Sequence, residues 1–163
     1  NNFMAEQLLR VLGVDSDEAS TWEGAREKAT NFLLNSVGFE AGSFNIHNGS
    51  GLYSGNEVSA RQFVQLLTYV AEQPYAPEFK ASLTIAGVDG TLRNRMKGGP
   101  VEGNVRGKTG TLNEVSALSG YARTTSGRTL AFSILFDDTP RRGWLYRPVQ
   151  DEIVEAIVGV SAP

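Results

Sequence analysis

The sequence contains no cysteine, which excludes disulfide bonds and thiolate metal sites. It contains one histidine, so a Ser-His-Asp hydrolase or a metal site built from several histidines would be hard to assemble. If the chain belongs to a hydrolase, its general base is expected to be a group other than histidine. No motif in the chain implies a metal or an organic cofactor.

Long apolar runs and a strong charge are also missing. No hydrophobic stretch approaches the roughly 20 residues that would cross a bilayer. The net charge of −3 gives no attraction toward nucleic acid, so no nucleic-acid partner is expected. With 163 residues, of which 40% are hydrophobic, the chain is long enough to form one domain with a core.

Helical periodicity dominates the first half of the sequence. Met4, Leu8, Val11 and Leu12 share one helical face, which predicts a helix from about Phe3 to Leu12. Asn2 stands where an N-cap is expected, and Gly13 is expected to end this helix.

Further helices are indicated by their start signals. Capping boxes at Ser20–Glu23 and Ser59–Gln62 predict helices that run to about Asn35 and Glu72. A short helix is expected over 78–83. The last helix is expected to begin around Pro148, with an apolar side of Val149, Ile153, Val154, Ile157 and Val158.

The apolar period changes to two in the second half. Strands are predicted over 105–111, 115–123 and 128–136, with a hairpin turn at 125–127, and a short strand is expected earlier, over 44–47. The third of the later strands is apolar on both faces, which predicts an interior strand covered by helices on both sides. The fold class is therefore α+β, an antiparallel sheet flanked by helices.

The strongest chemical signal is Lys108-Thr109-Gly110, followed by Thr111, on the first strand of that sheet. Lys108 offers a compact positive charge for a carboxylate, and the two threonine hydroxyls point to one strand face, where both can bond the same anion. Gly110 leaves room for a ligand to approach the backbone. Three letters also arise by chance, so a lysine beside a plain turn is the alternative interpretation.

Five stretches together are more specific than this tripeptide. The sequence resembles the S13-type D-alanyl-D-alanine carboxypeptidases, the penicillin-binding protein 4 family. The matching stretches, in the family's order, are 2–9 (Asn-Phe-Met-Ala-Glu-Gln-Leu-Leu), 48–52 (Asn-Gly-Ser-Gly-Leu), 86–92 (Ala-Gly-Val-Asp-Gly-Thr-Leu), 108–112 (Lys-Thr-Gly-Thr-Leu) and 118–121 (Leu-Ser-Gly-Tyr). The resemblance implies a penicillin-binding, serine β-lactamase-like transpeptidase fold, of which residues 1–163 would form the C-terminal portion of the catalytic domain.

The same resemblance implies roles for single residues. Lys108 and Asn2 would be catalytic, Asn2 as the asparagine of the family's Ser-x-Asn motif, and the backbone of Thr111 would contribute to the oxyanion hole. Thr109, Gly110 and Thr111 would bind substrate. Ser54-Gly55-Asn56 also spells Ser-x-Asn, but its setting in a glycine-rich segment favours a loop. Asn2 has an alternative role as a plain helix cap.

The nucleophile of this family is a serine in Ser-x-x-Lys, and no serine of the sequence has a lysine three residues later. The resemblance therefore implies an N-terminal portion of the same protein that carries this motif. It also implies hydrolysis of D-Ala-D-Ala or D-Ala-diaminoacid bonds in peptidoglycan stem peptides through an acyl-enzyme, acylation by β-lactam antibiotics, and a periplasmic or extracytoplasmic location.

Two alternatives remain open at this stage. One is a non-catalytic relative that binds a cell-wall peptide or a partner protein, and the other is a β-lactamase-like hydrolase. The sequence also departs from the family pattern: Asn48 replaces an acid, Tyr53-Ser54 replaces Ser-Arg, and Glu114 replaces a glycine. Each departure is expected to alter substrate preference rather than the core motif.

Other polar residues favour structural interpretations. His47 has no partner ligands close in sequence and is expected to be a surface or half-buried histidine. Asp137-Asp138 is expected to form a solvated turn, and Arg141-Arg142 a solvated pair.

Overall fold

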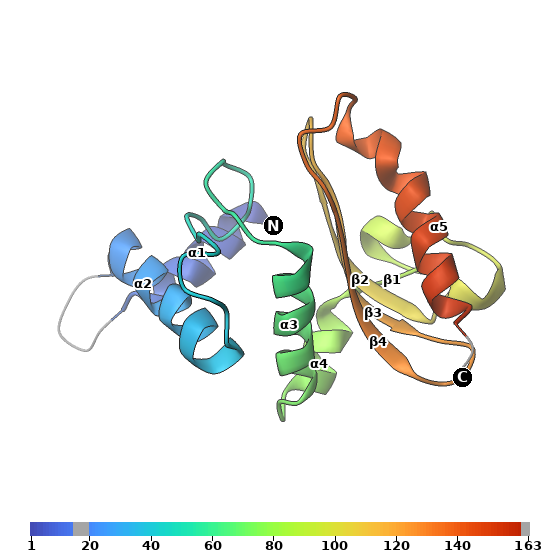
Figure 1. Ribbon diagram of the computed structural model, residues 1–163, viewed down its shortest axis with the longest axis horizontal. Helices are drawn as coiled ribbons and strands as arrows, with labels where there is room; N and C mark the ends of the chain where they lie inside the picture. The colour runs from blue at the N-terminus through green and yellow to red at the C-terminus, as the bar shows by residue number, and fades with distance from the viewer. Residues whose placement is uncertain (15–19, 161–163) are drawn as a thin grey trace. The chain divides into compact units, whose positions relative to one another are not determined.

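The computed structural model describes residues 1–14 and 20–160 of the chain (Figure 1). Two compact units follow one another in sequence, the first ending at Gln62 and the second beginning at Phe63. In the described ranges no helix is long and apolar enough to cross a membrane.

The first unit is built on two packed helices. Helix α1 (Asn2–Leu12) ends at Gly13, as predicted, and α2 (Trp22–Phe32) continues into the π-helical turn η1 (Leu33–Val37). A side chain on Gly13 would lie 2.7 Å from the carbonyl oxygen of Thr21 and 2.9 Å from the amide nitrogen of Ala25. The glycine therefore ends the helix and also allows the two helices to approach closely.

The N-caps predicted for α1 and α2 are each wrong by one position. The side chain of Asn1, not Asn2, accepts the amide hydrogen of Met4, and Thr21 rather than Ser20 caps α2. Propensity marks the neighbourhood of a cap, whereas backbone geometry selects which of two adjacent polar residues forms it.

The apolar face of α1 is only partly used within this unit. Leu9 is buried, but Met4, Leu8 and Val11 are between 58% and 66% exposed. The predicted strand over 44–47 is also wrong, because only Asn45 pairs, in an isolated bridge with Glu57.

The capping box at Ser59–Gln62 is confirmed. The amide of Ser59 donates to Gln62 Oε1 at 2.8 Å, and the amide of Gln62 donates to Ser59 Oγ at 3.3 Å. These bonds satisfy two backbone donors and start helix α3 (Ala60–Ala71). The short helix α4 (Ala76–Ser82) follows.

The second unit contains a four-stranded antiparallel sheet in the order β1-β2-β3-β4. Its strands are β1 (Thr84–Ile85), β2 (Val105–Thr111), β3 (Ser116–Arg123) and β4 (Thr129–Phe136). The last three match the prediction within one residue. The two-residue β1 was not predicted, since it is too short to show a period.

The connecting segments form single helical turns. The segment 87–103 contains the 3-10 turns η2 (Gly90–Leu92) and η3 (Gly99–Val101). A further 3-10 turn, η4 (Gly143–Tyr146), leads into the last helix, α5 (Arg147–Val158).

The sheet lies between α5 on one face and α3 with α4 on the other (Figure 1). This arrangement explains why β4 is apolar on both sides. The prediction that it is an interior strand is nevertheless wrong for the described sheet, where β4 pairs only with β3. Helices that cover both faces suffice to produce a two-sided apolar strand.

The α5 face holds the main core. Its buried members are Ala86, Leu92, Met96, Val101, Val105, Leu118, Ala122, Phe132, Val154 and Val158. Helix α5 contributes Val154 and Val158, whereas Val149 and Ile153 of the predicted apolar side are 42% and 38% exposed.

The opposite face is anchored by Tyr121. Its hydroxyl donates to the carbonyl oxygen of Leu67 in α3 at 2.6 Å, and the ammonium of Lys80 lies 4.9 Å from the ring centre. Burial raises the pKa of Tyr121 above its ordinary value, so the side chain stays a neutral donor at physiological pH.

Candidate active site

Strand β2 is paired along only part of its outer edge. Thr84 and Ile85 of β1 face Gly107 and Arg106, and β1 then ends. Beyond this point, the outer edge of Lys108–Thr111 has no strand beside it in the described sheet. On the inner side, β3 pairs with β2 along its whole length.

The backbone groups at this open edge follow from alternation. The carbonyl of Val105 accepts the amide of Ala86, and the carbonyl of Gly107 accepts the hydroxyl of Thr84, so these residues point toward β1. Because N–H and C=O groups alternate sides along a strand, those of Thr109 and Thr111 are directed to the same side, where β1 is absent. An extended peptide can add to a sheet at such an edge.

The side chains of this segment are divided between two faces. Thr109 and Thr111 pair with Leu118 and Ser116 and so share the α5 face, as predicted. Lys108 projects from the other face and is exposed, and its ammonium turns back to donate to the carbonyl of Thr109 at 2.5 Å. The strand thus presents one cation and two hydroxyls at a single edge.

Gly110 is not required by packing. A side chain there would meet only Ala117 Cβ, at the ordinary contact distance of 3.4 Å. A small side chain would therefore fit at Gly110, and the approach of a ligand to the backbone at this residue stays a prediction.

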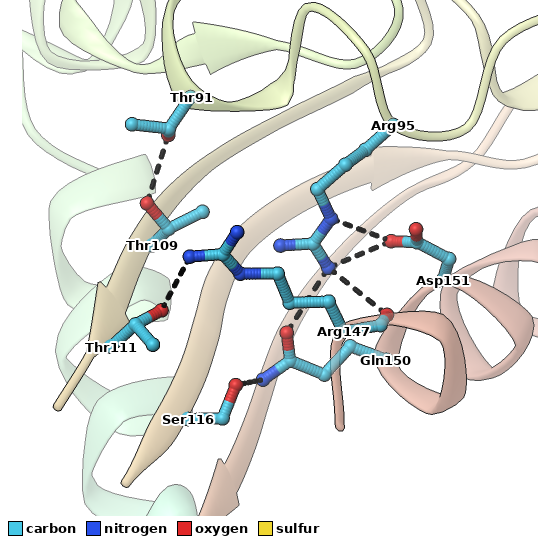
Figure 2. A network of polar contacts seen from close by, with 8 residues as sticks. All are labelled: Thr91, Arg95, Thr109, Thr111, Ser116, Arg147, Gln150 and Asp151. Atoms are coloured by element: carbon cyan, nitrogen blue, oxygen red, sulfur yellow. Dashed lines mark hydrogen bonds and ion pairs between the residues drawn. The ribbon is translucent and has the colours of Figure 1, made fainter. Parts of the chain in front are cut away.

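A second threonine supports the first. The hydroxyls of Thr109 and Thr91 lie 2.8 Å apart (Figure 2). Thr91 belongs to η2. Asp89, the residue that precedes this turn, accepts a hydrogen bond from the backbone amide of Ile85 at 2.6 Å. The sequence alone does not predict this contact between Thr91 and Thr109. The one indication of a role for Thr91 is that it lies in the stretch 86–92, which resembles the family.

Thr111 has a charged neighbour that sequence reasoning also missed. The guanidinium of Arg147, the first residue of α5, donates to Thr111 Oγ1 at 3.3 Å (Figure 2). The only sequence signal was its place just before Pro148 at the start of the last helix.

Asn2 lies in the other unit and is the first residue of α1, where it is exposed. Because Asn1 provides the cap, the Asn2 amide is not needed for that purpose. Its catalytic role stays a prediction.

Two stretches of the first unit bind each other through Glu6. Its carboxylate accepts the amides of Gly49 and Ser50, each at 3.0 Å, and the hydroxyl of Ser50 at 2.5 Å. A side chain on Gly49 would lie 2.4 Å from the carbonyl oxygen of Ala5. The loop 48–52, which we call the glycine loop, is therefore held tightly against α1.

These hydrogen bonds, chiefly the one from the Ser50 hydroxyl, lower the pKa of Glu6 below its ordinary value of 4.5. A lowered pKa in the folded state means that the ionised carboxylate stabilises the fold at neutral pH. This contribution is lost as the pH falls through the folded-state value. We expect Glu6→Gln to lower the midpoint of thermal unfolding by a few degrees at pH 7.

The same comparison near pH 3 is expected to show a smaller difference between wild type and Glu6→Gln. Glu27→Gln, which changes an exposed carboxylate of the same unit, serves as the control with little effect at either pH. An equal loss at both pH values would contradict the role assigned to the charge.

The buried side chain of Asn48 stabilises the glycine loop by hydrogen bonds to its backbone. Its amide group donates to the carbonyl of Tyr53 at 3.0 Å, and its oxygen accepts the amide of Gly51 at 2.7 Å. An ionised aspartate would lack the donor for Tyr53. The replacement of the family's acid by asparagine therefore has a structural explanation in this chain.

The competing Ser-x-Asn tripeptide is part of a loop, as predicted. Asn56 Oδ1 accepts the amides of His47 and Asn48, and its amide group donates to the carbonyl of Asn48. The polar atoms of this asparagine are thus committed to the loop itself.

The remaining polar candidates lie at the surface. His47 is exposed, and within the described ranges no group of three or more histidine, aspartate or glutamate side chains is arranged to hold a metal. Asp137 and Asp138 form an exposed bend in which Asp138 has a left-handed φ of 48°, and Arg141 and Arg142 are exposed.

The sequence of this chain is similar to those of known proteins. The sequence model of the D-Ala-D-Ala carboxypeptidase 3 (S13) family matches residues 1–162. A D-alanyl-D-alanine carboxypeptidase of Actinomadura sp. (strain R39) is 41% identical over 140 residues, which cover 83% of this chain and 26% of that protein. The chain thus spans about a quarter of the length of this relative.

Comparison of folds agrees. Penicillin binding protein 4 (dacB) from Haemophilus influenzae superposes with a TM-score of 0.86 at 22% identity, covering 98% of this chain and 37% of the other. A penicillin G acylated endopeptidase, Bd3459 from Bdellovibrio bacteriovorus, superposes with a TM-score of 0.70 at 21% identity, with 96% and 41% covered. The TLA-1 β-lactamase also gives 0.70, at 16% identity, with 97% and 58% covered. The fold is therefore that of penicillin-binding proteins and serine β-lactamases.

Proposed function

Because this chain belongs to the D-Ala-D-Ala carboxypeptidase 3 (S13) family, we propose that it forms the substrate-binding part of a serine peptidase that acts on peptidoglycan stem peptides. The enzyme would hydrolyse D-Ala-D-Ala or D-Ala-diaminoacid bonds outside the cytoplasm. The observation that carries the proposal is the open edge of β2, where Lys108, Thr109 and Thr111 present an ammonium and two hydroxyls.

Each group has a task in this reaction. A stem peptide ends in a free carboxylate, which the ammonium of Lys108 and the hydroxyls of Thr109 and Thr111 bind by charge-assisted hydrogen bonds. The peptide backbone pairs with the outward-facing groups of β2, which brings the scissile carbonyl near the amide of Thr111. This amide is one donor of the oxyanion hole, and Asn2 contacts the peptide backbone.

The nucleophile comes from an N-terminal portion of the same protein that carries Ser-x-x-Lys. Its serine attacks the D-Ala carbonyl, the C-terminal amine leaves with a proton, and the resulting ester is hydrolysed by water. A β-lactam would acylate the same serine. The structural neighbour described as acylated by penicillin G supports this part of the proposal.

The test compares the intact protein with the 163-residue chain alone. We expect the intact protein to release D-alanine from an acetylated D-Ala-D-Ala peptide and to be labelled covalently by a fluorescent penicillin. The isolated chain is expected to do neither, and its labelling would contradict the assignment of the nucleophile. An intact protein that binds the peptide without cleaving it would indicate a non-catalytic relative, and rapid turnover of penicillin would indicate a β-lactamase.

Thr109→Val removes one hydroxyl and nearly conserves the volume. We expect kcat/KM for the D-Ala-D-Ala peptide to fall by a factor equivalent to roughly 1–3 kcal/mol, since a charge-assisted hydrogen bond to the carboxylate is lost. Thr109→Ser, which keeps the hydroxyl, is the matched control and is expected to retain most of the activity. Equal effects of the two substitutions would argue against a role for the hydroxyl.

A further inference from the structure

The guanidinium of Arg147 lies at the open edge of β2, in contact with a residue of the proposed carboxylate site. Its Nη2 is 3.3 Å from Thr111 Oγ1, and the side chain is exposed (Figure 2). A hydroxyl that accepts from a cation keeps its own hydrogen for another acceptor. Thr111 can therefore donate to an anion while Arg147 donates to Thr111.

The backbone of Arg147 is held by the largely buried side chain of Arg95. Arg95 donates to the carbonyl oxygen of Arg147 at 3.3 Å and to Gln150 Oε1 at 3.0 Å. It also binds Asp151 through Nε at 3.0 Å and Nη2 at 2.7 Å, with both side chains largely buried. The first turn of α5 is thus tied to the segment that follows η2.

The same network reaches β3, the strand that pairs with Thr111. The amide of Gln150, a fully buried residue, donates to Ser116 Oγ at 3.1 Å, and Ser116 pairs with Thr111 across β2 and β3. Arg147, Arg95, Gln150, Ser116 and Thr111 therefore form a closed ring of contacts. Such a ring holds the base of the Arg147 side chain at a defined distance from Thr111.

The charges of this region do not balance. The charge of Arg95 is compensated by Asp151. Within residues 1–14 and 20–160, however, no carboxylate forms an ion pair with Lys108 or with Arg147. Two uncompensated cations that both contact the 109–111 segment attract an anion more strongly than one.

We propose that Arg147 is a second cationic binding residue for the terminal carboxylate of the stem peptide, acting beside Lys108 and through the hydroxyl of Thr111. This inference rests on the proposed function. A planar guanidinium donates two parallel hydrogen bonds to a carboxylate, which the ammonium of Lys108 cannot do. Arg147 therefore contributes selectivity for a free C-terminus as well as affinity.

The experiment measures kcat/KM of the intact protein on two matched substrates, an acetylated D-Ala-D-Ala peptide and its C-terminal carboxamide. We expect Arg147→Gln to lower kcat/KM for the acid by about 10- to 100-fold, mainly through KM, and to change the value for the amide by less than about threefold. Arg147→Lys is expected to recover part of the loss. Competition of each peptide with fluorescent penicillin gives its affinity, so that a slowly hydrolysed amide is still measured.

Arg123→Gln is the matched control, because Arg123 is exposed at the opposite end of β3 from Ser116. It is expected to leave both substrates unaffected. An Arg147→Gln variant that loses acid and amide equally, or neither, would overturn the inference while the peptidase assignment survives. A wild-type protein that hydrolyses neither substrate and is not labelled by penicillin would overturn both.

Discussion

Replacement of Lys108 by alanine is expected to reduce acylation of the intact protein by a fluorescent penicillin about 1,000-fold, to near the limit of detection. The release of D-alanine from a D-Ala-D-Ala peptide is expected to fall by a similar factor. This is the largest effect on activity that we expect from any single substitution in the chain.

The size of the effect follows from the position of the ammonium. Lys108 is exposed, and its amine bonds the backbone carbonyl of Thr109 at the open edge rather than a carboxylate of the described chain. Its charge is therefore available to the substrate. Alanine removes the ammonium but leaves the strand pairing with Ser119 in place.

Lys97→Ala serves as the control for Lys108→Ala, since it removes an exposed lysine of the same unit outside the sheet. Both variants are expected to unfold at the wild-type temperature, because neither side chain is buried. Normal labelling of a folded Lys108→Ala protein would refute the role given to this lysine.

Gly120→Ala is expected to destabilise the protein by about 3 kcal/mol or more, the largest loss of stability among our predictions. A side chain at this position would lie 2.0 Å from the carbonyl oxygen of Arg106 and 2.7 Å from Gly107 Cα. Both atoms belong to the backbone of β2 and cannot move aside without separating β2 from β3. Denaturant unfolding monitored by circular dichroism measures the effect.

Gly110→Ala provides the matched comparison in the neighbouring strand. Its new side chain would meet only Ala117 Cβ, at 3.4 Å, so the unfolding free energy is expected to stay within about 0.5 kcal/mol of wild type. Turnover of the D-Ala-D-Ala peptide is nevertheless expected to fall, because the methyl group enters the space proposed for substrate. A stable and fully active Gly110→Ala protein would contradict this use of the space.

The sequence predicts where the helices and strands of this fold lie better than it predicts how they pack against one another. Periodicity places the three long strands and α5 within one or two residues. It also identifies one face of α1, but Leu9, which lies outside that set, is the buried leucine of this helix. Hydrophobic periodicity shows which side chains share one face of a helix or strand, whereas their burial depends on which other element packs against that face.

The same limit applies to the candidate site. Lys108, Thr109 and Thr111 are contiguous, and a short motif suffices to predict them. The contacts of Thr91 with Thr109 and of Arg147 with Thr111 join residues 18 and 36 positions apart. No local pattern encodes such distances, so these supporting residues are found only from coordinates.

The two-residue length of β1 has a consequence for solubility. An open sheet edge attracts the strands of other protein molecules, and the risk grows with the length of the edge. β1 and Ala86 after it bond the outward-facing carbonyls of Val105 and Gly107, so the part of the β2 edge without a neighbouring strand is the short interval at Thr109 and Thr111, beside a lysine charge. This interval is too short for stable association between two copies of the protein, yet it matches a ligand that ends after two residues. A few residues added to β1 would close this stretch of β2 to other strands and to a ligand alike.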